Sequence, residues 1–434
     1  PSADSYASHI APLPSAAKGL EMTTETAGLL EIADRHITKG LGRMRDHIFK
    51  EGKGLRVLTT VSRVKTPRVQ VTADEQEGKQ LLDFTSGIGV TSLGHAHPDV
   101  TAAIIAQAQS IIHVQCAIAL SEPYVQLVES LLPMMPDPSL DSFFFWNSGS
   151  EAVEAAIKVT RAKTKRNNII VMGSSYHGRT SGAVALTRSK TVYSKGTGPL
   201  MVSLAVEPAI GHQLTPALLF TTPFPYWHAM GVSKETSEEE LVAQACLQLD
   251  NLLLQQTAPE DTAAIFIEPV IGEGGYVPAP AAYLQHIRKV CDKHGILMVA
   301  DEIQTGFGRT GKNFAVEHAN VVPDLMTFAK GFANGMPISG IVTKKDILAV
   351  MPPGSLGGTY SGNVVACAAA LATTRYMRTH DVLANVNARA EQVFKGLREI
   401  QADKANGGWL IEEVRGSGVS GRCHDPPANR MLTS

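Results

Sequence analysis

The fold of this chain follows from residues 281–311, AAYLQHIRKVCDKHGILMVADEIQTGFGRTG. Residues 281–294 carry apolar side chains at helical spacing and precede Gly295, which suits the left-handed position that ends many helices. An unbroken apolar run at residues 296–300 indicates a buried strand, as does the run at residues 263–267. Buried strands joined by helices are typical of a parallel sheet covered on both faces. We therefore expect an α/β fold with three layers, αβα, around a mainly parallel sheet.

The same alternation of strands and helices extends outward along the chain. Residues 220–240 lack either pattern and are expected to form a surface loop. Apolar runs predict strands at residues 142–146 and 168–172, and amphipathic patterns predict helices at residues 98–113, 120–134, 151–162 and from 364 to about 400.

We expect one large domain and one small α+β domain that is assembled from both chain ends. The large domain is placed at residues 85–345. Residues 1–56 are interpreted as an N-terminal extension with a helical segment from Thr23 to about Lys53, and residues 57–84 as strands of the small domain. Residues 346–434 are expected to complete the small domain, shortened and divergent after residue 418.

Composition excludes several classes of protein. The 434 residues include 39 Lys and Arg and 41 Asp and Glu, giving a formal charge of -2, so bulk charge provides no basis for binding nucleic acid or an anionic membrane. No apolar run approaches the ~18 residues that cross a bilayer. Five scattered cysteines without a CxxC pair disfavour a disulfide framework or a structural zinc site and favour a reducing compartment. With no clear presequence, we expect a cytoplasmic protein, with the mitochondrial matrix as the alternative.

Two side chains that follow predicted strands carry the strongest chemical signal. Asp301 comes directly after the strand at residues 296–300, and Lys330 follows a second short apolar run. Ligands of open α/β sheets bind beyond the carboxyl ends of the strands. A lysine among small residues loses its proton readily and attacks carbonyls, and a lysine with a facing anion is what pyridoxal phosphate needs. The alternative is a surface turn with an ordinary carboxylate and a solvated lysine.

Two Gly- and Ser-rich stretches offer anion sites. Residues 147–151, NSGSE, open a predicted helix, so that its first N–H groups and the hydroxyls of Ser148 and Ser150 can hold a phosphate. Simple helix capping is the alternative. Residues 357–363, GGTYSGN, can offer the hydroxyl of Thr359 to an anion, or can be a plain flexible loop.

A third stretch, SSYHGR at residues 174–179, combines an aromatic residue with a cation. Tyr176 can stack on a flat ring, and Arg179 can bind a carboxylate through two parallel hydrogen bonds. Core packing and a surface salt bridge are the alternatives for these two residues. His177 can act as a base, although a lone histidine is more often structural. Glu268 follows the strand at residues 263–267, so we expect it at the same rim as Asp301.

Taken together, these motifs resemble the class III, fold type I pyridoxal-phosphate aminotransferases. The resemblance runs from roughly Val57 to Gly418 and is strongest to 4-aminobutyrate aminotransferases. It rests on motifs that occur in the family order with near-family spacing: LDFTSGIGVTSLGHAHP, NSGSEAVEAAIKVTRAKTKR, YHGRTSGAVALT, IEPVIGEGGY, VADEIQTGFGRTG, TFAKG and LGGTYSGN.

The resemblance implies a role for each motif. Lys330 and Asp301 are implied as catalytic, Lys330 by forming a Schiff base with pyridoxal 5'-phosphate and moving a proton, and Asp301 by pairing with the pyridine nitrogen. It also implies a homodimer in which Thr359 reaches the phosphate of the neighbouring subunit. The cofactor-binding residues implied are Ser148, Gly149, Ser150, Tyr176, His177, Asp301, Gln304, Lys330 and Thr359.

The expected reaction is a ping-pong transfer of an amino group from an ω-amino acid resembling 4-aminobutyrate to a 2-oxo acid such as 2-oxoglutarate. By resemblance, Arg179 binds the distal carboxylate, Ile88 lines the substrate site, and Glu268 is a gate residue that pairs with a C-terminal arginine of the family. After Gly418 the sequence departs from the family pattern, so that arginine's role is assigned to no residue here.

Two alternatives remain open at this point. One is another class III activity, an ω-amine:pyruvate transaminase or an enzyme resembling dialkylglycine decarboxylase. The other is a protein that binds the cofactor with impaired catalysis because its C-terminal sequence is altered.

Overall fold

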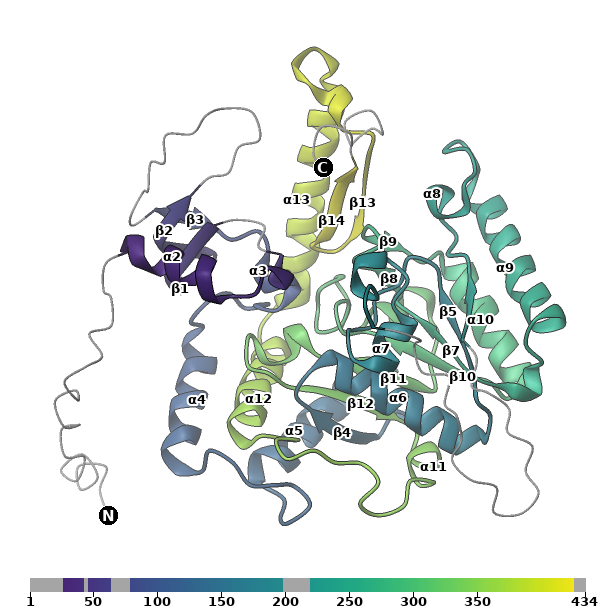
Figure 1. Ribbon diagram of the computed structural model, residues 1–434, viewed down its shortest axis with the longest axis horizontal. Coiled ribbons are helices and arrows are strands. Elements are labelled where there is room, and N and C mark those ends of the chain that lie inside the picture. Colours follow the sequence, from purple (N-terminus) through teal and green to yellow (C-terminus); the bar gives the residue numbers. More distant parts are fainter. Residues whose placement is uncertain (1–25, 43–45, 64–78, 198–218, 425–434) are drawn as a thin grey trace. The chain divides into compact units, whose positions relative to one another are not determined.

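The computed structural model describes residues 26–42, 46–63, 79–197 and 219–424 (Figure 1). By their internal contacts, the residues fall into two compact units, Pro1–Phe84 and Thr85–Ser434. The domain limits expected at residues 56, 345 and 418, and a small domain shared by both chain ends, stay predictions.

The first unit contains one helix and a small antiparallel sheet. Helix α2 is Thr26–His36, and the sheet has the order β1–β2–β3, with β1 at Asp46–Lys53, β2 at Arg56–Arg63 and β3 at Gln80–Leu82. The expected helical segment from Thr23 to about Lys53 is therefore wrong for its second half. Strand β1 pairs with β2 from Asp46 opposite Arg63 to Lys53 opposite Arg56, and this tertiary pairing overrides a weak local helical pattern.

The second unit is built on a seven-stranded sheet whose order is β4–β12–β11–β10–β7–β5–β6. Strand β12 is antiparallel to both of its neighbours, and the other adjacent pairs are parallel. The predicted, mainly parallel sheet is thereby confirmed. The strand bounds are β4 Ser142–Trp146, β5 Asn168–Met172, β6 Leu219–Thr222, β7 Thr262–Ile267, β10 Leu297–Asp301, β11 Leu325–Phe328 and β12 Ser339–Thr343.

Helices cover both faces of this sheet because its strands are apolar on both sides. Alternate strand residues such as Val299 and Leu325 pack against α6, α7 and α11. Their neighbours Met298 and Met326 face the opposite way, toward helices α4, α5, α9, α10 and α12. The helix bounds are α4 Pro98–Ser110, α5 Glu122–Leu131, α6 Gly149–Thr164, α7 Ser181–Leu186, α9 Glu238–Gln255, α10 Ala281–His294, α11 Lys345–Leu348 and α12 Val364–Thr379. This is the expected αβα layering.

Shorter elements complete the second unit. The loop expected at residues 220–240 is wrong in part, because the stretch contains most of the edge strand β6, Leu219–Thr222, the short helix α8, Trp227–Met230, and the first residues of α9. The long helix α13 has no buried residue. The remaining bounds are α3 Ser86–Gly89, α8 Trp227–Met230, α13 Val382–Ala402, the hairpin of β8 Val270–Ile271 with β9 Val277–Pro278, and the hairpin of β13 Glu413–Ser417 with β14 Ser420–His424.

Two general features bear on the predicted compartment. Within the part of the chain that the structure describes, no helix is long and apolar enough to cross a membrane. The five cysteines all lie in the described residues, and the structure joins none of them in a disulfide. The cytoplasmic location stays a prediction.

Candidate active site

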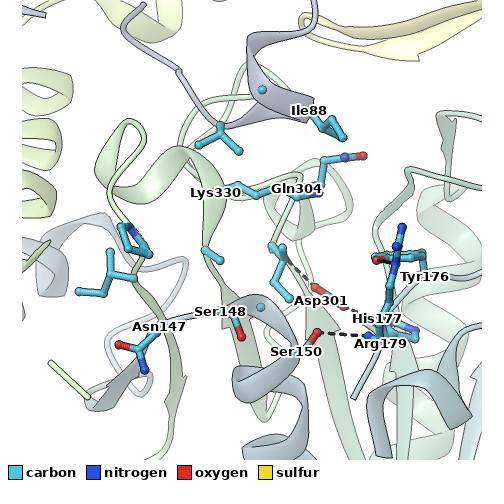
Figure 2. Close-up of a pocket in the computed structure, with 18 of the residues that line it drawn as sticks. Ile88, Asn147, Ser148, Ser150, Tyr176, His177, Arg179, Asp301, Gln304 and Lys330 are labelled. Carbon is cyan, nitrogen blue, oxygen red and sulfur yellow. Dashed lines mark hydrogen bonds and ion pairs between the residues drawn. The ribbon is translucent and has the colours of Figure 1, made fainter. Parts of the chain in front are cut away.

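The carboxyl ends of β7, β10 and β11 meet at one edge of the sheet, where a cavity of about 400 Å³ opens. This volume lies within the usual range for small-molecule sites. Figure 2 shows labelled side chains from several elements converging on this space. All predicted site residues except Thr359 line it, namely Ile88, Ser148, Gly149, Ser150, Tyr176, His177, Arg179, Glu268, Asp301, Gln304 and Lys330.

Lys330 stands two residues beyond the end of β11 and lines the cavity. Its backbone has a φ of 47°, a left-handed conformation that is rare for residues with a side chain. Burial lowers the pKa of its ammonium group below the ordinary value. Among the described residues, no carboxylate lies within ion-pair distance of Nζ. Burial therefore shifts the balance toward the neutral amine, which is the nucleophilic form.

Asp301 is the last residue of β10 and is held rigidly at the floor of the cavity. It is buried, with a relative exposure of 3%. Its Oδ1 accepts hydrogen bonds from the Ile303 N–H and the Thr327 hydroxyl, both at 3.1 Å. Its Oδ2 lies 2.6 Å from Nδ1 of His177. These partners fix the carboxylate in one orientation at the strand end.

His177 is buried behind Asp301 and is positioned by its own backbone. The His177 N–H donates to the Thr187 hydroxyl at 3.0 Å. Burial acts to lower the pKa of His177, but the hydrogen bond and charge of Asp301 outweigh it, so the pKa is raised. Its Nε2 is buried without a hydrogen-bond partner within the described part of the chain. His177 therefore orients Asp301 and supports its negative charge.

Glu268, one residue beyond β7, lies at the same edge, as expected from its position in the sequence. Its Oε1 accepts from the Tyr176 N–H at 2.7 Å, and its Oε2 accepts from the Gly272 N–H at 3.0 Å. Burial raises the pKa of Glu268 to about 7. No arginine among the described residues forms an ion pair with it. Arg415, the arginine of β13, instead pairs with Glu413 at 2.6 Å and donates to the Gly275 carbonyl.

The N-terminus of α6 forms one wall of the cavity. Ser148 is the N-cap residue, and its hydroxyl accepts from the Glu151 N–H while the Glu151 carboxylate accepts from the Ser148 N–H, a capping box. The alternative of helix capping is thus correct for the Ser148 side chain. The N–H groups of Gly149 and Ser150 begin the helix, where no helical carbonyl is available to them. A Cβ at Gly149 would lie 2.9 Å from the Ile303 side chain, so glycine is needed for the start of α6 to pack against Ile303, which also lines the cavity.

Tyr176, Gly178 and Arg179 belong to the loop between β5 and α7. The Arg179 Nε donates to the Tyr176 hydroxyl at 3.0 Å, and the Arg179 N–H donates to the Ser150 hydroxyl at 3.2 Å (Figure 2). Gly178 has a φ of 130°, and a Cβ there would lie 2.4 Å from the Ser150 hydroxyl. Only glycine combines this backbone conformation with this packing. The loop therefore places an arginine at the rim of the cavity that contains Lys330.

Several residues that support this loop were not singled out by sequence reasoning. Glu154 of α6 accepts hydrogen bonds from the Thr180 hydroxyl and from the Gly182 and Ala183 N–H groups. Glu273 and Tyr193 lie near Arg179, and Glu273 lines the cavity. Glu154 occurs in the quoted NSGSEAVEAAIK motif, but helical spacing alone does not reveal its partners, which lie 26 to 29 residues away in sequence.

Thr359 is the predicted site residue that this cavity does not include. It is exposed in the turn before α12, where Trp146 Nε1 donates to the nearby Gly357 carbonyl at 3.1 Å. Its predicted contact was with a neighbouring subunit, so its place in this chain leaves that prediction untested.

The residues present fit pyridoxal 5'-phosphate. The N–H groups of Gly149 and Ser150 and the hydroxyl of Ser150, at the start of α6, offer donors to a dianionic phosphate, while Ser148 caps the helix that presents them. Asp301 offers a fixed carboxylate to a protonated ring nitrogen, and Lys330 offers an amine to an aldehyde. Each of these groups lines the same cavity.

Comparison with known proteins gives the same result. Residues 58–424 match the model of the class III aminotransferase family. The chain is 39% identical over 347 residues to the 5-aminovalerate aminotransferase of Pseudomonas putida, covering 80% of this chain and 75% of the relative. It is 37% identical over 344 residues to the 4-aminobutyrate aminotransferase of Escherichia coli, covering 79% and 74%.

Solved structures of similar proteins include a taurine:2-oxoglutarate aminotransferase from Bifidobacterium kashiwanohense, in complex with PLP and glutamate. It aligns with a TM-score of 0.77 and 26% identity, covering 94% of this chain and 87% of that one. An (S)-enantioselective ω-transaminase from Thermomicrobium roseum aligns with a TM-score of 0.76 and 28% identity, covering 91% and 83%.

Proposed function

The chain belongs to the class III aminotransferases, pyridoxal-phosphate enzymes that transfer amino groups from a donor to an oxo acid, and we propose that its donors are ω-amino acids. The observation that carries this proposal is the position of Arg179 on the wall of the cavity that contains Lys330. A substrate with an amine at one end and a carboxylate at the other can engage both residues at once.

We propose that the cofactor is held by Lys330, Asp301 and the start of α6. Bound pyridoxal phosphate supplies an electron sink that acidifies the C–H bond beside the substrate amine. The rigid carboxylate of Asp301 favours a protonated ring nitrogen, and His177 keeps that carboxylate in place. Lys330 would hold the cofactor through its amine and would serve as the general base, and then the acid, for the proton of that C–H bond, a role that its burial favours by lowering the pKa of the ammonium group.

Other residues around the cavity are assigned to the ring and the substrate. We propose that Tyr176 stacks on the cofactor ring and that Gln304 hydrogen-bonds beside its hydroxyl, since both line the cavity. Ile88, which adopts a left-handed backbone with a φ of 67°, contacts the alkyl chain of the donor. Strain of this kind in a β-branched residue is characteristic of functional sites.

Glu268 is proposed to lie beside the bound donor. Burial raises the pKa of its carboxyl to about 7, so it takes up a proton far more readily than an exposed glutamate does. A protonated Glu268 adds little repulsion to a donor carboxylate held by Arg179.

We further propose a homodimer in which Thr359 completes the partner's phosphate site. Exposed apolar side chains gather in the segment that follows α4 and in the turn beside Thr359, as a buried interface requires. They are Ile111, Ile112, Ile118, Leu120 and Tyr360. Sedimentation of the purified holoenzyme tests this assembly, and a monomer at working concentration with full activity would overturn it.

A donor panel tests the proposed reaction. Purified holoenzyme is assayed with 4-aminobutyrate, 5-aminovalerate and butylamine, each against 2-oxoglutarate and pyruvate. We expect both amino acids to be better donors than butylamine because only they carry a carboxylate for Arg179. Absence of turnover of both amino acids would refute the proposal. Preferred turnover of butylamine with pyruvate would support the ω-amine:pyruvate alternative, and release of carbon dioxide from a dialkylglycine the decarboxylating one.

A further inference from the structure

The Arg179 guanidinium rests on a tyrosine that belongs to a different segment from the YHGR motif. The Arg179 Cζ lies 4.7 Å from the ring centroid of Tyr193 and 6.0 Å from that of Tyr176. The two tyrosine rings meet edge to face, with centroids 5.2 Å apart. Arg179 is thus in contact with the face of one ring and hydrogen-bonded to the hydroxyl of the other.

Tyr193 is itself fixed at both ends. It is the last residue of a 3-10 turn, Thr191–Tyr193, and its side chain is half-buried. Its hydroxyl donates to Oε2 of Glu273 at 3.1 Å, and the Lys190 ammonium pairs with the same oxygen at 3.3 Å. Glu273 is therefore neutralised by partners other than Arg179, although it lines the same cavity.

This arrangement leaves the Arg179 fork free for a ligand. Its Nε is occupied by the Tyr176 hydroxyl, and within the described part of the chain no carboxylate lies within ion-pair distance of Arg179. The terminal N–H groups are those that bind a carboxylate in a bidentate manner. A guanidinium that lies on an aromatic face keeps its positive charge and its N–H donors, while the contact restricts the rotation of the arginine side chain.

We infer that Tyr193 is a specificity-determining residue, whose ring fixes the Arg179 guanidinium and so sets the distance between amine and carboxylate in the accepted donor. This inference rests on the proposed function. A fixed guanidinium discriminates between amino acid donors that differ by one methylene, whereas a mobile guanidinium can reach the carboxylate of either donor. Tyr193 acts here by positioning Arg179, and it takes no part in the chemistry.

The test uses holoenzyme of the full chain and three variants. Tyr193→Leu removes the ring, Tyr193→Phe keeps the ring and loses the bond to Glu273, and Val192→Ala is a control in the same turn with an exposed side chain. The first half-reaction is followed by the absorbance of the bound cofactor, without acceptor, for 4-aminobutyrate, 5-aminovalerate and butylamine. Calorimetry gives the dissociation constants of butanoate and pentanoate, which bind without reacting.

We expect Tyr193→Leu to bring the ratio of the two amino acids' kcat/KM values closer to one by roughly two- to fivefold, the range for an exposed cation–π contact. The ratio of the butanoate and pentanoate dissociation constants shifts in the same direction. Butylamine kinetics stay unchanged, and Tyr193→Phe and Val192→Ala keep the wild-type ratios.

Three results would overturn the inference. Unchanged ratios in Tyr193→Leu would show that the ring does not set donor length. An equal loss of kcat/KM for butylamine and both amino acids in Tyr193→Leu would indicate a merely structural role of Tyr193. A ratio shift in Tyr193→Phe as large as in Tyr193→Leu would assign the effect to the hydroxyl. These outcomes differ from failure of the proposed function, in which wild-type enzyme itself shows no preference for the amino acids over butylamine, and which overturns both.

Discussion

Removal of the Glu154 carboxylate should loosen the loop that carries Arg179. One oxygen of Glu154 accepts from the Thr180 hydroxyl at 2.6 Å, the Gly182 N–H at 2.8 Å and the Ala183 N–H at 3.1 Å. Two of these donors are first-turn N–H groups of α7, which have no helical carbonyl to bind. Thr180, the N-cap residue, makes no capping bond of its own. Glu154 therefore supplies the N-terminal cap of α7 from another helix.

The magnitude follows from those three bonds. A hydrogen bond to a charged group contributes about 1.5–3 kcal/mol, and a carboxylate at a helix N-terminus about 0.3–1 kcal/mol more. Because Glu154 is only partly buried and water replaces some of the lost bonds, we expect Glu154→Ala to lower the free energy of unfolding by about 2–4 kcal/mol. Glu154→Gln keeps an acceptor oxygen and should lower the free energy of unfolding by about 1 kcal/mol, because only the contribution of the negative charge is lost.

Urea unfolding of the holoenzyme measures these differences, with Glu391→Ala as a control on an exposed face of α13. A surface change of this kind is expected to stay within about 0.5 kcal/mol. The KM for 4-aminobutyrate should rise more than that for butylamine in Glu154→Ala, because the loop positions Arg179. Equal stability of Glu154→Ala and the control, or equal changes in both KM values, would refute this reasoning.

Three further changes have definite expected outcomes. Gly178→Ala places a Cβ 2.4 Å from the Ser150 hydroxyl at a φ of 130°, so urea unfolding should show a loss of about 2–5 kcal/mol, and a loss below 1 kcal/mol would contradict the strain. Arg179→Lys loses the bidentate fork, so kcat/KM for 4-aminobutyrate should fall by roughly 5- to 150-fold while butylamine is unaffected; equal losses would remove Arg179 from substrate binding. Burial raises the pKa of Glu302 to about 7. Between about pH 4.3 and about pH 7 the folded chain therefore keeps a proton that the unfolded chain releases, and the free energy of unfolding falls as pH rises through this range. Glu302→Gln should therefore gain stability relative to wild type as pH rises from about 4.3 to about 7 in urea unfolding, and parallel stability curves would show that Glu302 does not titrate there.

Much of the fold was predictable because its core strands are continuous apolar runs. The runs ending at Ala300 and Ile267 lie in adjacent parallel strands, with Ala300 opposite Ile267. Helix α10 spans Ala281–His294 and is capped by Gly295 in the left-handed conformation, with a φ of 62°. In these elements the local sequence pattern and the tertiary packing favour the same structure, so the sequence pattern is enough to predict them.

The errors occurred where local pattern and tertiary pairing disagree. Strand β1 carries charged residues at either side of Ile48 and Phe49, and only its pairing with β2 makes it a strand. Edge strand β6, Leu219–Thr222, is half-exposed and short, so it has no continuous apolar run to distinguish it from a loop. Such elements depend on a neighbour that the sequence does not identify.

The candidate site shows the same division. Asp301, Glu268 and Lys330 were predictable because each stands at or just beyond the carboxyl end of a recognisable strand, and such ends meet at one rim. Tyr193 and Glu154 were not, because their importance comes from contacts with Arg179 and with the start of α7. Neither contact has a fixed sequence spacing. Tyr193 and Glu154 support residues of the motifs through contacts that have no recognisable sequence pattern, so the motifs alone do not reveal them.

The central claim is that Lys330 and Arg179 act on the two ends of one ω-amino acid through a bound pyridoxal phosphate. Its most direct test is the absorbance spectrum of the holoenzyme through one full cycle. We predict that the visible band of the bound cofactor disappears on addition of 4-aminobutyrate or 5-aminovalerate and returns on addition of 2-oxoglutarate, and that Lys330→Ala shows no such cycle. A wild-type band that forms but does not change with either donor would contradict the account.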